Sequence, residues 1–262
     1  MTEQQAATRE TRRAQRKKGH RVDYHLIKLG VLLRYGGLAR HPLLRGLPDH
    51  LRDNIAKRFI FSPKHGFTYQ RVPKAANSTI ARTLAAHILG NEAIRRDGHG
   101  ARAKGRLRRL PSPEQFADSF SFTFVRDPAT RVLSAWRDKG HNTKYMRRYG
   151  LEDPKAPGRP IAFSDFLRRL DAGLLDKDLH WCPQTLMLVD GGRAFDFVGR
   201  VERIETDLPH VMERIFGSAA APATSPVDRT GASARAAQDI SADDMRLIRR
   251  LYAEDYAFIA EL

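Results

Sequence analysis

A lysine and two hydroxyl residues stand between a predicted strand and a predicted helix, where an anion could bind. N–H groups at the start of a helix lack partners within the helix and lie at the positive end of its dipole, so they suit a phosphate or sulfate group. Small residues let the backbone approach the anion, while a lysine and hydroxyls add donors. Short motifs have many false positives, so an ordinary strand–helix turn with an exposed lysine fits equally. The residues of this segment are Pro73, Lys74, Ala75, Ala76, Asn77, Ser78 and Thr79.

A second candidate for anion binding follows the next predicted strand, residues 121–125. Arg126 stands at the carboxyl end of that strand, where open α/β sheets bind ligands, and Ser134 lies two turns into the following helix. An arginine offers planar, charge-assisted donors that suit a second phosphate. The structural alternative is an ion pair between Arg126 and Asp127, with Ser134 as a small packing residue.

The elements that would position these residues alternate between strands and helices. Such alternation is typical of βαβ units, so we expect an α/β fold: a P-loop-like, three-layer α/β/α arrangement with a central, mostly parallel sheet. Ser164, Thr206 and Ser241 are the predicted N-caps of the last three helices. The predicted strands are 67–72, 121–125 and 195–200, and the predicted helices are 79–89, 129–139, 164–170, 206–216 and a single final helix after Ser241.

Composition indicates a folded domain with a basic surface. The chain has 262 residues, of which 41% are hydrophobic, enough for one large α/β domain. Residues 1–22 are polar and charged, without apolar periodicity, and predict a basic flexible tail before a single domain over 23–262. Lys and Arg number 46 against 30 Asp and Glu, a formal net charge of +16. Such a surface attracts polyanions, which include nucleic acid, anionic lipid, acidic glycans and phosphorylated cofactors.

The compartment is predicted from the cysteine count and the apolar segments. Cys182 is the only cysteine, so no intrachain disulfide can form, which favours a reducing compartment. The basic N-terminus lacks the apolar core of a secretory signal, and no apolar run reaches the roughly 20 residues that span a bilayer. We therefore expect a cytoplasmic protein without a transmembrane segment. Cys and His do not cluster at metal-ligand spacing, so no metal site is expected.

Together the two motifs resemble the signatures with which sulfotransferases bind 3′-phosphoadenosine-5′-phosphosulfate (PAPS). PKAANST resembles the 5′-phosphosulfate loop, and RDP followed by RVLSAW is similar to the 3′-phosphate segment. The closest resemblance is to the carbohydrate sulfotransferases of chondroitin and dermatan, sulfotransferase family 2. It continues in order to residue 262, through segments 139–150, 180–184 and 195–208. Those animal enzymes carry a membrane anchor and paired cysteines, which this sequence lacks, so we expect a soluble bacterial relative.

The resemblance implies in-line transfer of a sulfuryl group from PAPS to a hydroxyl of a carbohydrate or glycan-like acceptor, without a metal. It implies nucleotide binding by residues 73–79 with Arg126 and Ser134, and a catalytic role for Lys74 at the leaving phosphate. His99, between the two motifs, is the expected general base, because related enzymes place a catalytic histidine there; a solvent-exposed histidine in a basic loop is the alternative. The residues expected on the acceptor side are His180, Trp181, Gln184 and Glu202. The alternatives are a core position for Trp181, which fits equally well, and a contact with a neighbouring arginine for Glu202.

Two other classes of protein remain open at this stage. A P-loop-type phosphoryl transferase, such as a kinase, shares the expected fold, but no glycine lies between Gly66 and Gly90 to complete a Walker A motif. A basic nucleic-acid-binding module would explain the charge and the basic stretch 95–109, yet the sequence lacks an aromatic-rich binding signature. We therefore expect a carbohydrate or another hydroxyl compound, including an acidic one, as the partner, and no nucleic acid.

Overall fold

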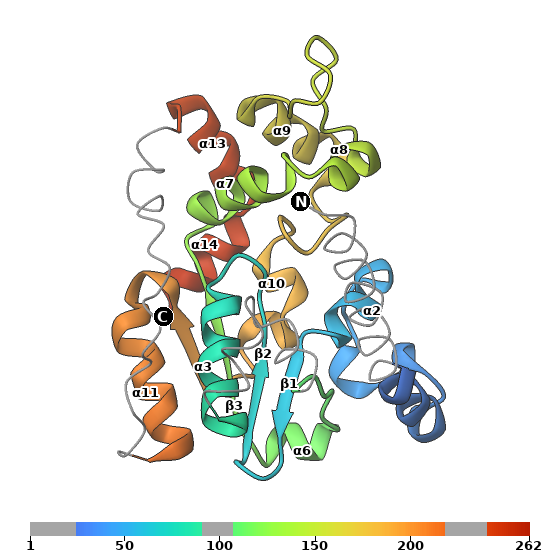
Figure 1. The fold of residues 1–262 in the computed structure, drawn as a ribbon, viewed down its shortest axis with the longest axis vertical. Coiled ribbons are helices and arrows are strands. Elements are labelled where there is room, and N and C mark those ends of the chain that lie inside the picture. The colour runs from blue at the N-terminus through green and yellow to red at the C-terminus, as the bar shows by residue number, and fades with distance from the viewer. Residues whose placement is uncertain (1–24, 91–106, 218–239) are drawn as a thin grey trace, which may run out of the picture.

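A four-stranded sheet with helices on both faces forms the centre of the molecule (Figure 1). The computed structural model describes residues 25–90, 107–217 and 240–262, so the predicted tail over 1–22 lies outside the described residues. Strand β1 (Phe59–Ser62) is antiparallel to β2 (Phe67–Gln70), whereas β2, β3 (Phe120–Val125) and β4 (Phe197–Arg200) are parallel. The expected α/β class with a mostly parallel sheet is confirmed.

Alternation along the strands sends their side chains to two different helical layers. Aromatic side chains of β2 and β3 pack on one face against α3 (Asn77–Leu89) and α11 (Ile204–Phe216). The other face packs against α2 (Asp49–Ala56), α10 (Gln184–Met187) and α14 (Ala253–Ala260). Because successive strand residues point to opposite faces, this pattern buries the sheet on both sides.

A second group of helices lies beyond the carboxyl ends of the parallel strands (Figure 1). It consists of α7 (Pro128–Lys139), α8 (Thr143–Tyr149), α9 (Phe163–Arg169) and α13 (Ala242–Leu251). Their apolar sides share a core with Trp181, which is fully buried. Within this group, α7 lies next to the carboxyl ends of the strands, where the two predicted anion-binding segments begin.

The remaining elements are short. Residues 25–35 are helical, and α6 (Pro113–Ala117) precedes β3. None of the helices within the described ranges is long and apolar enough to cross a membrane. Single helical turns occur at Leu38–Arg40, Pro42–Leu44, Leu170–Leu174, Val189–Gly192 and Val201–Arg203.

Four local predictions were wrong. β1 was not predicted, and the final helix is two helices that break at Tyr252. Ser164 does not cap α9, whose N-cap is Ala162; its hydroxyl instead donates to Asp244 of α13 over 2.8 Å. Thr206 lies inside α11 and donates back to the carbonyl of Arg203 over 2.9 Å. Hydroxyl side chains can bond to several nearby partners, so a serine or threonine alone does not fix a helix start.

The close packing of β4 on β3 predicts that Gly199→Ala destabilises the fold. An added Cβ would lie 2.5 Å from the ring of Phe124, so one strand must shift. We expect a loss of about 1–3 kcal/mol, as for other overpacked cores, measured by urea unfolding. Gly30→Ala is the matched control, because a Cβ at this helical position meets nothing within 4 Å and should stabilise by about 0.5–1 kcal/mol. Equal stability of the Gly199 variant and the wild type would contradict this packing.

Candidate active site

The two predicted anion-binding segments meet at one edge of the sheet. β2 and β3 are parallel neighbours, with Gln70 paired to Thr123, so the segments that follow them emerge side by side. Arg126 Nη1 donates to the carbonyl oxygen of Lys74 over 3.2 Å. The structure therefore brings Lys74 and Arg126 together, as the sequence predicted.

The loop before α3 has an unusual backbone conformation. Lys74 has φ 68° and Ala76 has φ 48°, both in the left-handed region that glycine normally occupies. For other residues this region costs about 1–2 kcal/mol per residue. Ala76 is also the N-cap of α3, and its methyl group cannot accept a hydrogen bond from the helix. The first N–H groups of α3 therefore have no side-chain cap from this residue.

The ammonium group of Lys74 points to α7. Its Nζ lies 2.8 Å from Asp138 Oδ2, and the Nζ of Lys139 lies 3.0 Å from the same oxygen. Burial alone would raise the pKa of Asp138, but the hydrogen bonds from Lys74 and Lys139 outweigh it and hold that pKa below its usual value. The two lysines share one carboxylate, so positive charge exceeds negative charge in this cluster.

One face of α7 lines the space between the two segments. Thr130, Ser134 and Asp138 follow one another at intervals of four residues, which places them in a row along a helix. Thr130 Oγ1 accepts from Arg126 Nε over 3.1 Å, and Asp138 binds Lys74 at the other end of the row. Ser134 is half-buried and lies one turn from each, on the face directed to both cations.

Arg126 is held by its backbone as well as its side chain. Gln184 accepts from the N–H of Arg126 (3.0 Å) and donates to its carbonyl (2.8 Å), and Glu202 accepts from the N–H of Asp127 (2.9 Å). Burial lowers the pKa of the Arg126 guanidinium, and the charges of Glu202 and Asp127 oppose that effect. Two of the residues expected to line the acceptor side therefore support Arg126.

A buried arginine that sequence reasoning missed connects three segments at this edge. Arg131 is fully buried, and its guanidinium donates to the carbonyls of Pro73 (3.1 Å), Leu179 (3.0 Å) and Cys182 (2.8 Å). A buried guanidinium is tolerated when its donors are satisfied, as they are here. The arginine of the RVLSAW segment was visible in the sequence, but its spacing gave no indication that it points inward.

The other two residues expected on the acceptor side have different environments. Trp181 is fully buried and its indole N–H donates to the carbonyl of Leu174 over 2.7 Å, so its ring belongs to the core. The side chain of His180 is 17% exposed, and its Nδ1 lies 2.5 Å from Asp178 Oδ1. Burial lowers the pKa of His180, and Asp178 partly offsets this by favouring the charged ring. Of this pair, only His180 has an exposed side-chain surface.

His99, the histidine expected to act as base, lies outside the described residues. Among the residues that the structure describes, no group of three or more His, Cys, Asp or Glu side chains could hold a metal ion. Cys182 is buried, and burial raises the pKa of its thiol far above neutral pH, so it is not a nucleophile at physiological pH.

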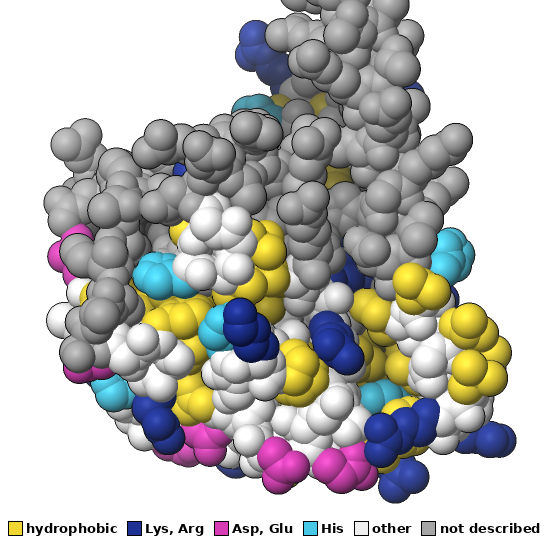
Figure 2. Space-filling model, turned by 60° about the horizontal axis from the view of Figure 1, so that its bottom comes forward, with side chains coloured by type: hydrophobic (Ala, Val, Ile, Leu, Met, Phe, Trp, Pro, Cys, Tyr) yellow, Lys and Arg dark blue, Asp and Glu magenta, His cyan; other side chains and the backbone are white. Residues whose placement is uncertain are grey.

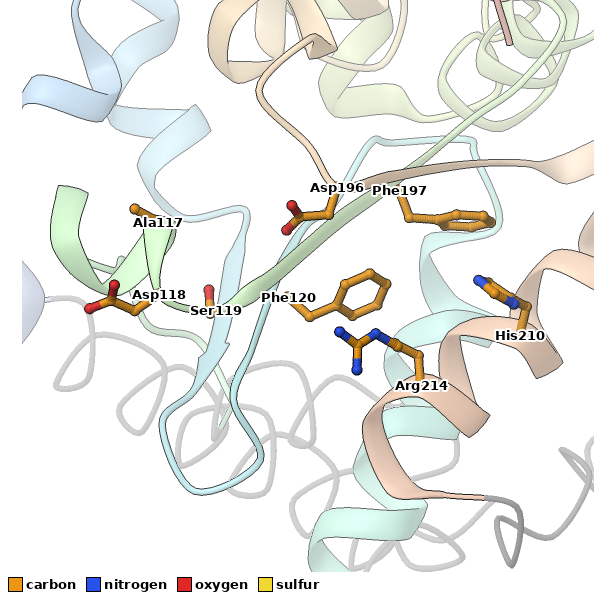
Figure 3. Close-up of a pocket in the computed structure, with 8 residues that line it drawn as sticks. All are labelled: Ala117, Asp118, Ser119, Phe120, Asp196, Phe197, His210 and Arg214. Atoms are coloured by element: carbon orange, nitrogen blue, oxygen red, sulfur yellow. The ribbon is translucent and has the colours of Figure 1, made fainter.

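A hollow of about 470 Å³ lies at the opposite edge of the sheet. Phe120 and Phe197, which begin β3 and β4, line it together with His210 and Arg214 of α11, and Arg214 stacks over the ring of Phe120 (Figure 3). On the end of the molecule that Figure 2 presents, hydrophobic, neutral, basic and acidic side chains are mixed. This hollow is thus separate from the edge that carries Lys74 and Arg126.

Comparison with known proteins identifies related sequences. A model of the sulfotransferase family matches residues 57–258. Carbohydrate sulfotransferase 14 of Mus musculus is 33% identical over 193 residues, which cover 68% of this chain and 51% of that relative. Carbohydrate sulfotransferase 9 of Homo sapiens is 25% identical, over 70% of this chain and 44% of its own length. Carbohydrate sulfotransferase 10 of Danio rerio is 24% identical, over 88% of this chain and 73% of its own length.

The chain spans about half the length of the first of these relatives. No solved structure matches it.

The position of Arg131 predicts that Arg131→Lys is strongly destabilising. An ammonium group cannot reach three carbonyls that diverge around a planar guanidinium, and each buried acceptor left unpaired costs about 1–3 kcal/mol. We expect a clear fall in the urea midpoint. Arg137→Lys, at an exposed position of the same helix, is the matched control and should change stability by less than about 0.5 kcal/mol. Equal effects of the two substitutions would rule out the proposed role of Arg131.

Proposed function

This chain belongs to the sulfotransferase family, and we propose that it transfers a sulfuryl group from PAPS to a hydroxyl group of a carbohydrate. The contact between Arg126 and the carbonyl of Lys74 is the observation that carries this proposal, because it places both nucleotide-binding motifs at one edge of the sheet. A ligand with phosphate groups on both the 3′ and the 5′ oxygen of its ribose needs two such cationic positions within reach of each other.

The proposal assigns the 5′ side of the nucleotide to the loop before α3. The uncapped helix start and the backbone N–H groups of residues 75–79 would hold the phosphosulfate. Lys74 would exchange Asp138 for the bound anion, which is favourable because Lys139 stays with that carboxylate. The 3′-phosphate would lie against Arg126 and Ser134. This second phosphate-binding site would distinguish PAPS from ATP.

PAPS supplies the activated sulfuryl group, and the residues of the chain bind, orient and stabilise charge. Lys74 would stabilise the negative charge that develops on the leaving phosphate oxygen, which is the largest contribution a fixed cation can make. A histidine would take the proton of the acceptor hydroxyl, and His99 is the candidate that the sequence offers. No metal is part of the proposal.

A carbohydrate is the proposed acceptor because the relatives named above are carbohydrate sulfotransferases. The formal net charge of +16 supports an acidic carbohydrate as well as a neutral one, since a basic surface attracts polyanions. Transfer of labelled sulfate from PAPS to a panel of chondroitin, dermatan and neutral oligosaccharides tests this choice.

A thermal-shift measurement separates this function from phosphoryl transfer. The desulfated product 3′-phosphoadenosine-5′-phosphate (PAP) should raise the melting temperature, because it retains both phosphates that Lys74 and Arg126 would bind. ATP with magnesium should raise it less, since ATP has no 3′-phosphate for Arg126. Stabilisation by ATP with magnesium and not by PAP would favour a kinase and contradict the proposal.

Lys74→Ala should lower sulfate transfer by about 10²–10³-fold, the usual loss when one donor to a developing charge is removed. Arg126→Ala should also greatly reduce transfer, because it removes the charge-assisted donors to the 3′-phosphate. Initial rates with labelled PAPS provide the measurement, and unfolding midpoints show whether the fold survives. Lys64→Ala and Arg193→Ala, both at exposed positions, are the matched controls and should turn over like the wild type. Transfer at the wild-type rate by either the Lys74 or the Arg126 variant contradicts its assigned role.

A further inference from the structure

We propose that His180, oriented by Asp178, is the general base that takes the proton from the acceptor hydroxyl. This inference rests on the proposed function, and it assigns to His180 the step for which the sequence offered His99. His180 has a fixed orientation, a position beside the Lys74 loop, and surroundings that keep its ring uncharged.

The shortest contact of the His180 ring is with the carboxylate of Asp178, and the hydroxyl of Tyr145 lies 3.5 Å from the same ring nitrogen, Nδ1. Asp178 Oδ1 accepts from the ring Nδ1 (2.5 Å) and from the backbone N–H (3.0 Å) of His180. Asp178 Oδ2 accepts from the hydroxyl of Tyr149 over 2.9 Å, which fixes the carboxylate in turn. With the proton on Nδ1 directed at Asp178, the lone pair of the ring lies on Nε2. A carboxylate that accepts from Nδ1–H in this way leaves Nε2 as the ring nitrogen that can act as a base.

His180 lies beside the Lys74 loop because one guanidinium binds both segments. Arg131 donates to the carbonyl of Pro73, which immediately precedes Lys74, and to the carbonyl of Leu179, which immediately precedes His180. The nitrogens of a guanidinium are only about 2.3 Å apart, so two carbonyls bound at about 3 Å belong to neighbouring peptide groups in space. The backbone at Leu179–His180 therefore lies next to the backbone at Pro73–Lys74.

A second path through side chains leads from His180 to Lys74. The ring of Tyr145 meets the ring of His180 edge-on, with 5.6 Å between centroids, and the ammonium of Lys139 lies 4.9 Å from the centroid of Tyr145. Lys139 and Lys74 share the carboxylate of Asp138. The histidine therefore borders the cationic cluster that would surround a transferring sulfuryl group.

The segment 178–182 is rigid around this histidine. Trp181 is buried next to Tyr149 and Phe166, and its carbonyl accepts from the hydroxyl of Tyr252 over 2.5 Å. The carbonyl of Cys182 is bound by Arg131. A base must hold its geometry to within a fraction of an ångström, and these contacts provide that support from both sides of His180.

Burial is the main influence that favours the neutral form of His180. It lowers the pKa of the ring, Asp178 raises that pKa, and Lys139 of α7 and Arg58, which precedes β1, lower it further, so that the balance is a pKa below the ordinary value. Tyr145 of α8 and Tyr149 remain uncharged, because burial and Asp178 raise the pKa of both hydroxyls, that of Tyr145 to about 12. At neutral pH the ring is thus unprotonated and able to accept a proton.

In the proposed step the acceptor hydroxyl gives its proton to Nε2 of His180. The acceptor oxygen then forms a bond to sulfur with its lone pair, and the bond between sulfur and the 5′-phosphate oxygen breaks. The electron pair of that bond stays on the phosphate oxygen of PAP, next to Lys74. The imidazolium proton passes to water after the sulfate ester and PAP leave, so atoms and charges balance.

His180→Asn is the decisive variant, because an asparagine amide can still donate to Asp178 while Nε2 is removed. We expect kcat for sulfate transfer to fall by about 10²–10⁴-fold, the usual contribution of a general base, while the thermal shift with PAP remains. His141→Ala, at an exposed position just after α7, is the control and should keep the wild-type kcat.

The possible results separate the inference from the proposed function. A wild-type kcat for His180→Asn, or a large loss for His99→Ala alone, overturns the assignment while the proposed function stands. Loss of the PAP shift in His180→Asn would place the residue in nucleotide binding and also overturn it. If the wild-type chain neither binds PAP nor transfers sulfate, the proposed function fails and this inference fails with it.

Asp178→Asn tests the positioning role of the carboxylate through the pH profile. Asp178 favours protonated His180, so its replacement should lower the pKa of the ring further and move the acid limb of the kcat profile to lower pH. A purely structural role of Asp178 would lower kcat or stability without moving that limb. An unmoved acid limb therefore removes Asp178 and His180 from the proton transfer.

Discussion

The candidate site depends on a buried guanidinium that binds three backbone carbonyls. Arg131 joins the carbonyl before Lys74, the carbonyl before His180 and that of Cys182. The carbonyl of Pro73 belongs to the loop before α3, the carbonyls of Leu179 and Cys182 belong to one later segment, and Arg131 itself comes from α7. A positive charge in the core is expensive unless its donors are satisfied, so the segments must meet at this point for the fold to be stable.

That constraint also explains how the loop before α3 keeps its conformation without glycine. Lys74 and Ala76 occupy the left-handed region, and such strain persists only where the surroundings over-determine it. Arg131 holds the carbonyl of Pro73, and Arg126 holds the carbonyl of Lys74. The two arginines thus fix two successive peptide groups of the loop from α7 and from the end of β3. The strained residues Lys74 and Ala76 lie in the loop that leads into the uncapped first turn of α3.

Hydrogen bonds from other residues hold the backbone of Arg126 in position. Gln184 brackets the backbone of Arg126, and Asp255 of α14 accepts from the backbone N–H groups of Gln184 and Thr185 at the start of α10. The carboxylate of Asp255 is fully buried, and these donors compensate its burial. The C-terminal helix thereby contributes to the position of Arg126 although it lies far from it in sequence. Support of this kind fixes a cation more tightly than its own contacts could.

The sequence by itself determined those features that depend on neighbours a few residues apart. It predicted the strand, loop and helix around Lys74, the second strand that ends at Arg126, and the Ser241 cap, which the structure confirms through the bond from Asp244 N to Ser241 Oγ. Periodicity and caps act within one or two turns, so a linear pattern reveals them.

Only the tertiary structure decided which polar side chains face each other across long separations. Gln184 binds Arg126 from 58 residues away, and Glu202 binds Asp127 from 75 residues away, so neither pairing leaves a trace in local spacing. The same holds for the burial of Arg131 and Trp181. The pair of Asp178 and His180 is local, but the place of its segment next to the Lys74 loop depends on the bonds from Arg131. The packing of the whole chain decides which side of a segment faces a site. The free energy of burial is summed over many contacts, and the order of residues along the chain does not show which of these contacts form.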